Sequence, residues 1–351
     1  MINAFRNYSL MLVVFIHAHI YTTSYQNVDV PSWLVYFYNN CLGFFHPASV
    51  LAAISGYLFF KDFSVNHKNW GVFYGEKYFK RMKSIFVPFF FWITVFFIIN
   101  NVLIYFSAAS GPGLFVSEFS PLSLTNYIKA FFYPELAVAK HLWYLNNMLF
   151  AFAMAPVILM LNRNRMLMWG ILLLMAVLYY FYWRENTSQA KLIIKYRFIV
   201  FFMAGSFFGL NKQYFNLVML NKVIVIAICT LLFFIAFTAH RYTNDFAFAY
   251  VVNSVVITIL IFMLGYYLIG KFSPHKDTIY NRSEHFFLYI VHPFMLSLIC
   301  KALFQTHFFT LGSYWVALLF ALVLSFVIVK LNKVLYKLFS RYFKKLSHMV
   351  L

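Results

Sequence analysis

Charged residues are scarce in this sequence of 351 amino acids. Only 11% of the residues are Asp, Glu, Lys or Arg, whereas soluble globular domains contain about 25%. Apolar residues make up 63% of the chain, and aromatic side chains alone make up 23%. A soluble enzyme needs more polar surface than this to cover its core, while a chain in lipid can expose apolar side chains. The composition therefore excludes a soluble domain and predicts an integral membrane protein.

Cysteine is nearly absent. The three cysteines, Cys41, Cys229 and Cys300, lie inside apolar stretches, with no CxxC motif and no histidine at metal-ligand spacing nearby. We therefore expect neither disulfides nor a bound metal.

Acidic residues are also few, which leaves a formal net charge of +19. A soluble protein with this charge would be a candidate for binding nucleic acid, but here most basic residues lie in short gaps between apolar stretches. Lys and Arg accumulate in the cytoplasmic loops of membrane proteins, which accounts for this distribution. We therefore expect membrane lipids as partners and no nucleic acid.

Ten apolar segments approach the roughly 20 residues that a transmembrane helix needs: about 8–22, 41–60, 85–107, 141–161, 166–183, 196–210, 221–239, 246–270, 283–305 and 312–336. Placing the N-terminus inside puts 20 of the 28 Lys and Arg residues on the cytoplasmic side. The sequence therefore predicts an all-α, polytopic membrane helix bundle of about ten transmembrane helices, with both termini cytoplasmic.

No internal repeat or soluble appendage interrupts the apolar pattern, so we expect a single integral membrane domain over 1–351. Its core spans cover about 8–336, and 337–351 form a basic cytoplasmic tail. The longest polar interruption, about 108–140, falls on the outer side and is expected to carry an interfacial helix or a functional lid.

Ionisable side chains inside membrane spans are functional candidates. Arg6 and His17 lie eleven residues apart in the opening segment, which on a helix places both on one face, about 16 Å apart along the axis. A cation at the cytoplasmic rim can hold an anionic donor, and a deeper imidazole can perform acid–base chemistry. The alternative is a snorkelling arginine and a buried, hydrogen-bonded histidine.

Three further segments combine polar residues with apolar surroundings. Lys77, Lys80, Arg81 and Lys83 precede the third span and suit either phosphate groups or anionic lipid. His141, Trp143 and Tyr144 open the fourth span, where aromatic rings indicate either a binding site or an interfacial belt. His292 and Pro293 lie within the ninth span and indicate either a kink or a site.

Ser55 and Gly56 interrupt the second span. Glycine permits close approach of helix backbones, so this pair indicates helix packing, or else a functional kink or a substrate contact.

The order of these segments resembles the acyltransferase-3 family of integral membrane O-acyltransferases over most of the chain. The matching segments are Arg6-x10-His17, Pro47 through ISGYLFF, KRMKSIFVPFFFW, HLWYL with the helix reaching Pro156, FIVFFMAGSFFG and FFLYIVHPF. The chain departs from the family at one place. The family often has two basic residues three positions apart before the third span, but here the residue three positions after Arg81 is Ser84. Lys80 and Lys83 have that spacing one residue earlier.

The resemblance implies an acyltransferase of the class that transfers groups other than amino-acyl groups, in the bacterial cytoplasmic (inner) membrane. It implies cytoplasmic acyl-CoA, commonly acetyl-CoA, as the donor, and a hydroxyl of a cell-surface or lipid-linked glycan as the acceptor. O-antigen of lipopolysaccharide and exopolysaccharide are examples of such glycans. Some relatives carry a further hydrolase-like domain, so we expect a separate periplasmic transferase partner or no second step.

Within this resemblance, His17 and Arg6 correspond to the family's catalytic Arg-x10-His pair. Arg6 with Lys80, Arg81 and Lys83 would hold the CoA phosphates, while His141, Trp143, Tyr144 and His292 would contact the acceptor. His17 would act as general base or accept the acyl group transiently, and the residues leave both open. The rival class is a transporter or lipid-linked glycan flippase, which performs no covalent chemistry.

Overall fold

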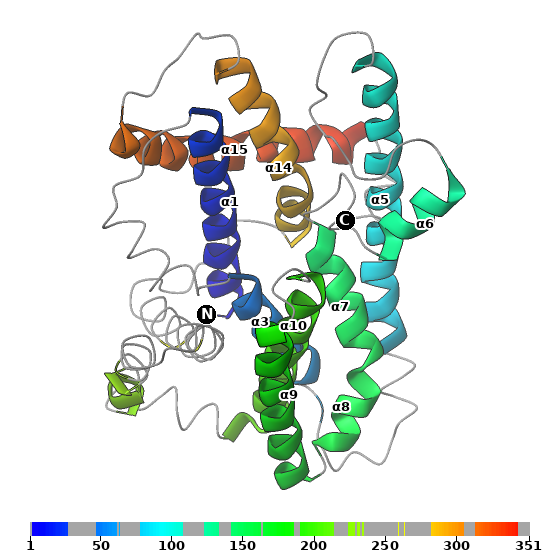
Figure 1. The fold of residues 1–351 in the computed structure, drawn as a ribbon, viewed down its shortest axis with the longest axis vertical. Helices are drawn as coiled ribbons and strands as arrows, with labels where there is room; N and C mark the ends of the chain where they lie inside the picture. Colours follow the sequence, from blue (N-terminus) through cyan, green and yellow to red (C-terminus); the bar gives the residue numbers. More distant parts are fainter. Residues whose placement is uncertain are drawn as a thin grey trace. The chain divides into compact units, whose positions relative to one another are not determined.

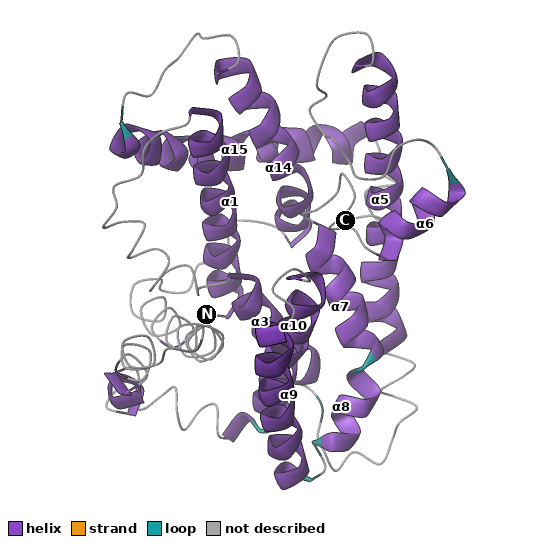
Figure 2. Cartoon of the chain, in the orientation of Figure 1, coloured by secondary structure: helices purple, strands orange, loops and turns teal. Residues whose placement is uncertain are grey.

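The described part of the chain is helical throughout. A computed structural model of the protein describes residues 2–26, 47–61, 63, 78–107, 123–132, 142–162, 164–185, 190–213, 224–228, 230–231, 234, 259, 263, 282–304 and 313–342. Over these ranges every regular element is a helix, and no strand is found (Figure 2). The predicted all-α fold class is therefore confirmed for these residues.

The principal helices follow one another along the chain as Figure 1 labels them. Their bounds are α1 Ile2–Gln26, α3 Pro47–Phe60, α5 Phe79–Ser107, α6 Leu124–Phe132, α7 Trp143–Ala153, α8 Ala155–Leu161, α9 Arg165–Glu185, α10 Ala190–Leu210, α14 Arg282–Phe304 and α15 Tyr314–Tyr342. Helices suit these apolar segments because a helix satisfies its backbone N–H and C=O groups internally.

Most of the predicted spans coincide with helices. Among the residues listed above as described, three helical stretches are long and apolar enough to cross a membrane: Phe79–Ile99, Ser283–Phe304 and Tyr314–Tyr342. The bent pair α7 and α8, which covers the predicted span 141–161, would be a fourth. Of the predicted span 221–239 the structure describes 224–228, 230–231 and 234, which are helical, and of the predicted span 246–270 it describes only residues 259 and 263. The count of ten and the cytoplasmic termini stay predictions.

The chain divides into two compact units. The first comprises Met1–Val13, Val30–Lys68 and Met154–Ile279, and the second comprises Val14–Asp29, Asn69–Ala153 and Tyr280–Leu351. Each unit draws on segments that are far apart in the sequence, and α1 contributes to both. The prediction of a single domain over 1–351 stays a prediction.

In the first unit, α3 and α10 pack with their backbones in contact. A Cβ atom on Gly56 would overlap the carbonyl oxygen of Phe202, and one on Gly205 would overlap the carbonyl oxygen of Ala53. Only glycine permits this approach, and the rings of Phe60 and Phe202 close the contact with centroids 6.3 Å apart. The packing interpretation of the Ser55-Gly56 segment therefore agrees with the structure.

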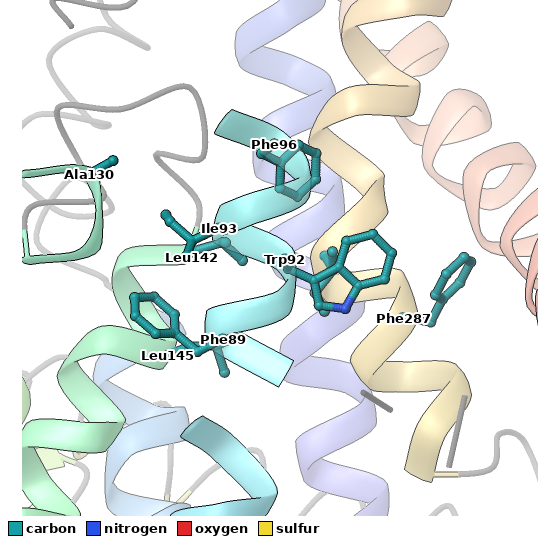
Figure 3. Packing of buried hydrophobic residues seen from close by; sticks show 9 residues of the cluster. Phe89, Trp92, Ile93, Phe96, Ala130, Leu142, Leu145 and Phe287 are labelled. Atoms are coloured by element: carbon teal, nitrogen blue, oxygen red, sulfur yellow. The ribbon is translucent and has the colours of Figure 1, made fainter. Parts of the chain in front are cut away.

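In the second unit, α5 lies at the centre of an apolar cluster (Figure 3). Trp92 points toward Phe287 of α14, with ring centroids 6.1 Å apart, and its ring also contacts Phe339 of α15 at 6.2 Å. Leu142 and Leu145, at the start of α7, belong to the same cluster. The cluster therefore includes residues of α5, α7, α14 and α15, which pack against one another.

The predicted outer loop 108–140 contains α6, an amphipathic helix that packs along α5. The Phe131 ring lies 5.1 Å from that of Phe89, and the Tyr127 hydroxyl is 2.7 Å from Thr94 Oγ1. Asn146 Nδ2 of α7 donates a 3.1 Å hydrogen bond to the carbonyl oxygen of Phe131. The segment 108–140 therefore contains a helix, which contacts α5 at Phe89 and Thr94. Its position at the membrane interface stays a prediction.

Helix α15 separates small and large side chains onto two faces. Ala317 and Ala321 are fully buried, whereas Leu319, Val323 and Phe326 are each more than half exposed. Small residues on the packed face and large apolar residues on the open face are typical of helices in contact with lipid.

Candidate functional site

His17 of α1 and His292 of α14 form a hydrogen-bonded pair within the second unit. His17 Nδ1 lies 2.9 Å from His292 Nε2, and 275 residues separate the two in sequence. The ring centroids are 5.1 Å apart and the ring planes are inclined by 19°. Nearly parallel ring planes with the two nitrogens 2.9 Å apart are compatible with an N–H···N hydrogen bond between the rings.

The second ring nitrogen of His292 is bonded to the backbone. His292 Nδ1 lies 2.9 Å from the carbonyl oxygen of Leu288, one turn earlier on α14. The His292 side chain is fully buried, at 0% exposure, whereas His17 retains partial exposure. Of the two imidazoles, His17 is therefore the one that can be reached from outside the pair.

A row of aromatic rings leads from the pair toward the start of α7. The Tyr289 ring lies 6.3 Å from that of His292, and the Tyr144 ring lies 5.7 Å from that of Tyr289. Trp143 contacts Tyr144 at 6.2 Å. Two predicted acceptor residues, Trp143 and Tyr144, are thus linked through Tyr289 to the histidine pair.

Arg6 lies on α1 together with His17, as the sequence predicts, because α1 runs without a break from Ile2 to Gln26. The helix rise separates the two residues by about 16 Å along the axis. The predicted acceptor residue His141 lies outside the described residues.

The three candidate phosphate-binding cations lie in the first two turns of α5. Lys80 and Lys83 are exposed and Arg81 is half-buried. The Ser84 hydroxyl donates a 2.8 Å hydrogen bond to the carbonyl oxygen of Arg81. A helix N-terminus carries partial positive charge, so this placement adds to the attraction that the three side chains exert on an anion.

A metal site was not expected from the sequence. In the part of the chain that the structure describes, no group of three or more His, Cys, Asp or Glu side chains is placed so that it could hold a metal ion.

Sequence reasoning missed the direct contact between the two histidines and the part played by Tyr289. A signal was available: His17 and His292 are both ionisable side chains well inside predicted spans, and such side chains pair with one another or with backbone carbonyls. Both kinds of partner occur here, because His292 bonds His17 on one side and Leu288 on the other.

Comparison with known proteins identifies a family for this chain. No curated protein matches the chain, and no solved structure does. The sequence model of the acyltransferase-3 family, described as an acyltransferase domain, matches residues 2–330. This range includes α1 with Arg6 and His17, the cations of α5, and His292 of α14. Because the match covers nearly the whole chain, the protein belongs to the acyltransferase-3 family.

Proposed function

We propose that the protein is an O-acyltransferase of the bacterial inner membrane that moves an acetyl group from cytoplasmic acetyl-CoA to a hydroxyl of a lipid-linked or cell-surface glycan. The observation that carries the proposal is the position of His17. It is a partly exposed imidazole inside a helix of an acyltransferase, and it is oriented by the buried His292.

The proposed donor site uses the charges near the cytoplasmic ends of α1 and α5. Arg6 with Lys80, Arg81 and Lys83 would bind the CoA phosphates through charge-assisted hydrogen bonds. The thioester would then extend along α1 toward His17.

The proposed reaction uses His17 as a general base. His17 takes the proton of the acceptor hydroxyl while the hydroxyl oxygen attacks the thioester carbonyl. The C–S bond breaks as the tetrahedral intermediate collapses, and His17 returns the proton to the CoA sulfur. In the covalent variant, His17 attacks the thioester carbonyl, the C–S bond breaks and CoA leaves as its thiolate. The acceptor hydroxyl then displaces the imidazole from the acyl group, and the hydroxyl proton passes to the thiolate.

Trp143 and Tyr144 are the proposed contacts of the acceptor. Their rings offer apolar faces of the kind that sugar rings cover, and the contacts through Tyr289 lead from them to the histidine pair.

The test compares the purified full-length protein in detergent with His17→Ala. Acetyl-CoA is the donor and a lipid-linked oligosaccharide extract is the acceptor, with release of the CoA thiol and labelled acetyl in the lipid fraction as readouts. We expect the substitution to lower the transfer rate about 10²- to 10⁴-fold while stabilisation by acetyl-CoA in a thermal-shift assay is retained.

The matched control is His19→Ala. His19 lies on the same helix, but its ring packs against Tyr314, with centroids 5.5 Å apart, and we expect transfer to continue. Wild-type activity in His17→Ala would remove His17 from the mechanism. A folded wild-type protein that neither binds acetyl-CoA nor releases thiol would contradict the enzyme proposal and favour the flippase.

A further inference from the structure

The hydrogen bonds around His292 assign this residue a role that differs from acceptor binding. We infer that His292 is a positioning residue that holds His17 in the Nδ1–H tautomer, so that His17 Nε2 is the reacting atom. The inference rests on the proposed function, in which His17 is the base or nucleophile.

The chain of hydrogen bonds has one consistent direction when both rings are neutral. The carbonyl oxygen of Leu288 can only accept, so His292 Nδ1 carries a hydrogen and donates it. A neutral imidazole has one N–H, which leaves a lone pair on His292 Nε2. His17 Nδ1 must then donate to that lone pair across the 2.9 Å contact. The remaining nitrogen of His17, Nε2, therefore holds the lone pair.

Burial favours the neutral state of His292 on which this direction depends. The side chain is 0% exposed and lies in the middle of an apolar helix, where an imidazolium would be costly. Both of its ring nitrogens are engaged, one by Leu288 and one by His17. A glycan hydroxyl would have to break one of these bonds to reach His292.

The arrangement has a clear consequence for proton transfer. When His17 Nε2 takes the proton of the acceptor hydroxyl, His17 becomes an imidazolium, and its Nδ1–H bond to His292 becomes charge-assisted and stronger. The proton leaves again from Nε2 to the CoA sulfur as the C–S bond breaks. His292 keeps its own Nδ1 hydrogen throughout, so it orients and stabilises His17 and exchanges no proton with the substrates.

Two conservative substitutions of His292 distinguish positioning from space filling. A glutamine amide reaches the place of the imidazole Nε2, so His292→Gln keeps an acceptor for His17. An asparagine amide reaches only the place of Nδ1, so His292→Asn keeps the bond to Leu288 and loses the bond to His17.

We expect His292→Asn and His292→Phe to lower kcat about 10²-fold, with the KM values for acetyl-CoA and glycan within about twofold of wild type. We expect His292→Gln to recover most of the rate. His285→Phe, which alters another buried histidine of α14, is the matched control and should keep its activity. Equal rates in the Gln and Asn variants, or a large rise in the KM for the glycan alone, would overturn the inference.

Nitrogen-15 NMR of histidine-labelled wild-type protein provides a readout that does not need activity. The His17 signals, identified by their loss in His17→Gln, should show a protonated Nδ1 and an unprotonated Nε2. The opposite tautomer would overturn the inference even if the enzyme is active. An inactive wild-type protein with the expected tautomer would contradict the proposed function alone.

Discussion

At the scale of single residues, buried asparagines of the second unit donate hydrogen bonds to backbone carbonyls, either of another helix or of their own helix. Asn332 of α15 is fully buried, and its Nδ2 donates a 3.1 Å hydrogen bond to the carbonyl oxygen of Glu284 in the first turn of α14. Asn101 differs, because its Nδ2 donates to Phe97 of its own helix, α5. The first kind of bond fixes two helices to each other, and the second does not.

This difference predicts unequal effects of the same substitution. Asn332→Leu preserves the approximate volume but leaves the Glu284 carbonyl without its side-chain donor. It should lower the free energy of unfolding by about 0.5–1.5 kcal/mol, the net contribution of one hydrogen bond, measured as a lower thermal midpoint in detergent. Asn101→Leu, the matched control, should cost less. Equal losses of unfolding free energy in the two variants would show that the hydrogen bond between α14 and α15 contributes no more to stability than the bond within α5.

The histidine pair shows which part of the site could be predicted at this scale. Arg6 and His17 were identified because they share one helix and its 3.6-residue period. The contact of His17 with His292 joins residues 275 positions apart, and no local pattern specifies which distant helix α1 meets. The contact between the rings of Tyr144 and Tyr289 could not be predicted for the same reason, because it joins two helices that are far apart in the sequence.

At the scale of helices, hydropathy predicted most elements correctly because length and apolarity are local properties. The segment 141–161 was predicted as one span, but it forms α7 and α8 with a break at Met154. Pro156 lies in the first turn of α8, where its missing N–H removes no helical hydrogen bond. Pro156 is therefore the sequence feature that indicates the start of a second helix here.

The contact of α3 with α10 leads to a prediction at the same scale. Gly205→Ala would drive a Cβ atom into the carbonyl oxygen of Ala53, a backbone group that cannot move unless the helices separate. We expect a loss of about 1–3 kcal/mol in the free energy of unfolding, read from thermal unfolding in detergent.

The control for Gly205 is Gly170, in the exposed part of α9, where a Cβ atom would meet nothing within 4 Å. Gly170→Ala should leave stability unchanged or raise it by up to about 1 kcal/mol, because alanine favours the helix over glycine. A Gly205→Ala protein as stable as Gly170→Ala would contradict the close contact of α3 and α10.

At the scale of the whole molecule, the surface is apolar where a soluble protein would be charged. Trp315, Leu319 and Phe326 of α15 are each more than half exposed, as is Leu173 of α9. Such side chains are stable in contact with lipid tails and unstable in water. This property follows from composition, so it was predictable without any knowledge of the contacts between helices.

The distribution of basic residues predicts how the chain crosses the membrane. An even number of spans with cytoplasmic Lys and Arg places Leu351 and the loop 61–84 inside, and 108–140 outside. A green fluorescent protein joined after Leu351 or within 61–84 should fluoresce. An alkaline phosphatase joined within 108–140 should be active, because that enzyme matures only outside the cytoplasm. If the fusion within 61–84 fluoresces and the fusion after Leu351 does not, an odd number of spans must lie between these two points, which would contradict the predicted topology. The donor site would be tested by the fusion within 61–84, since a loop on the outer side would place the cations of α5 away from cytoplasmic acetyl-CoA.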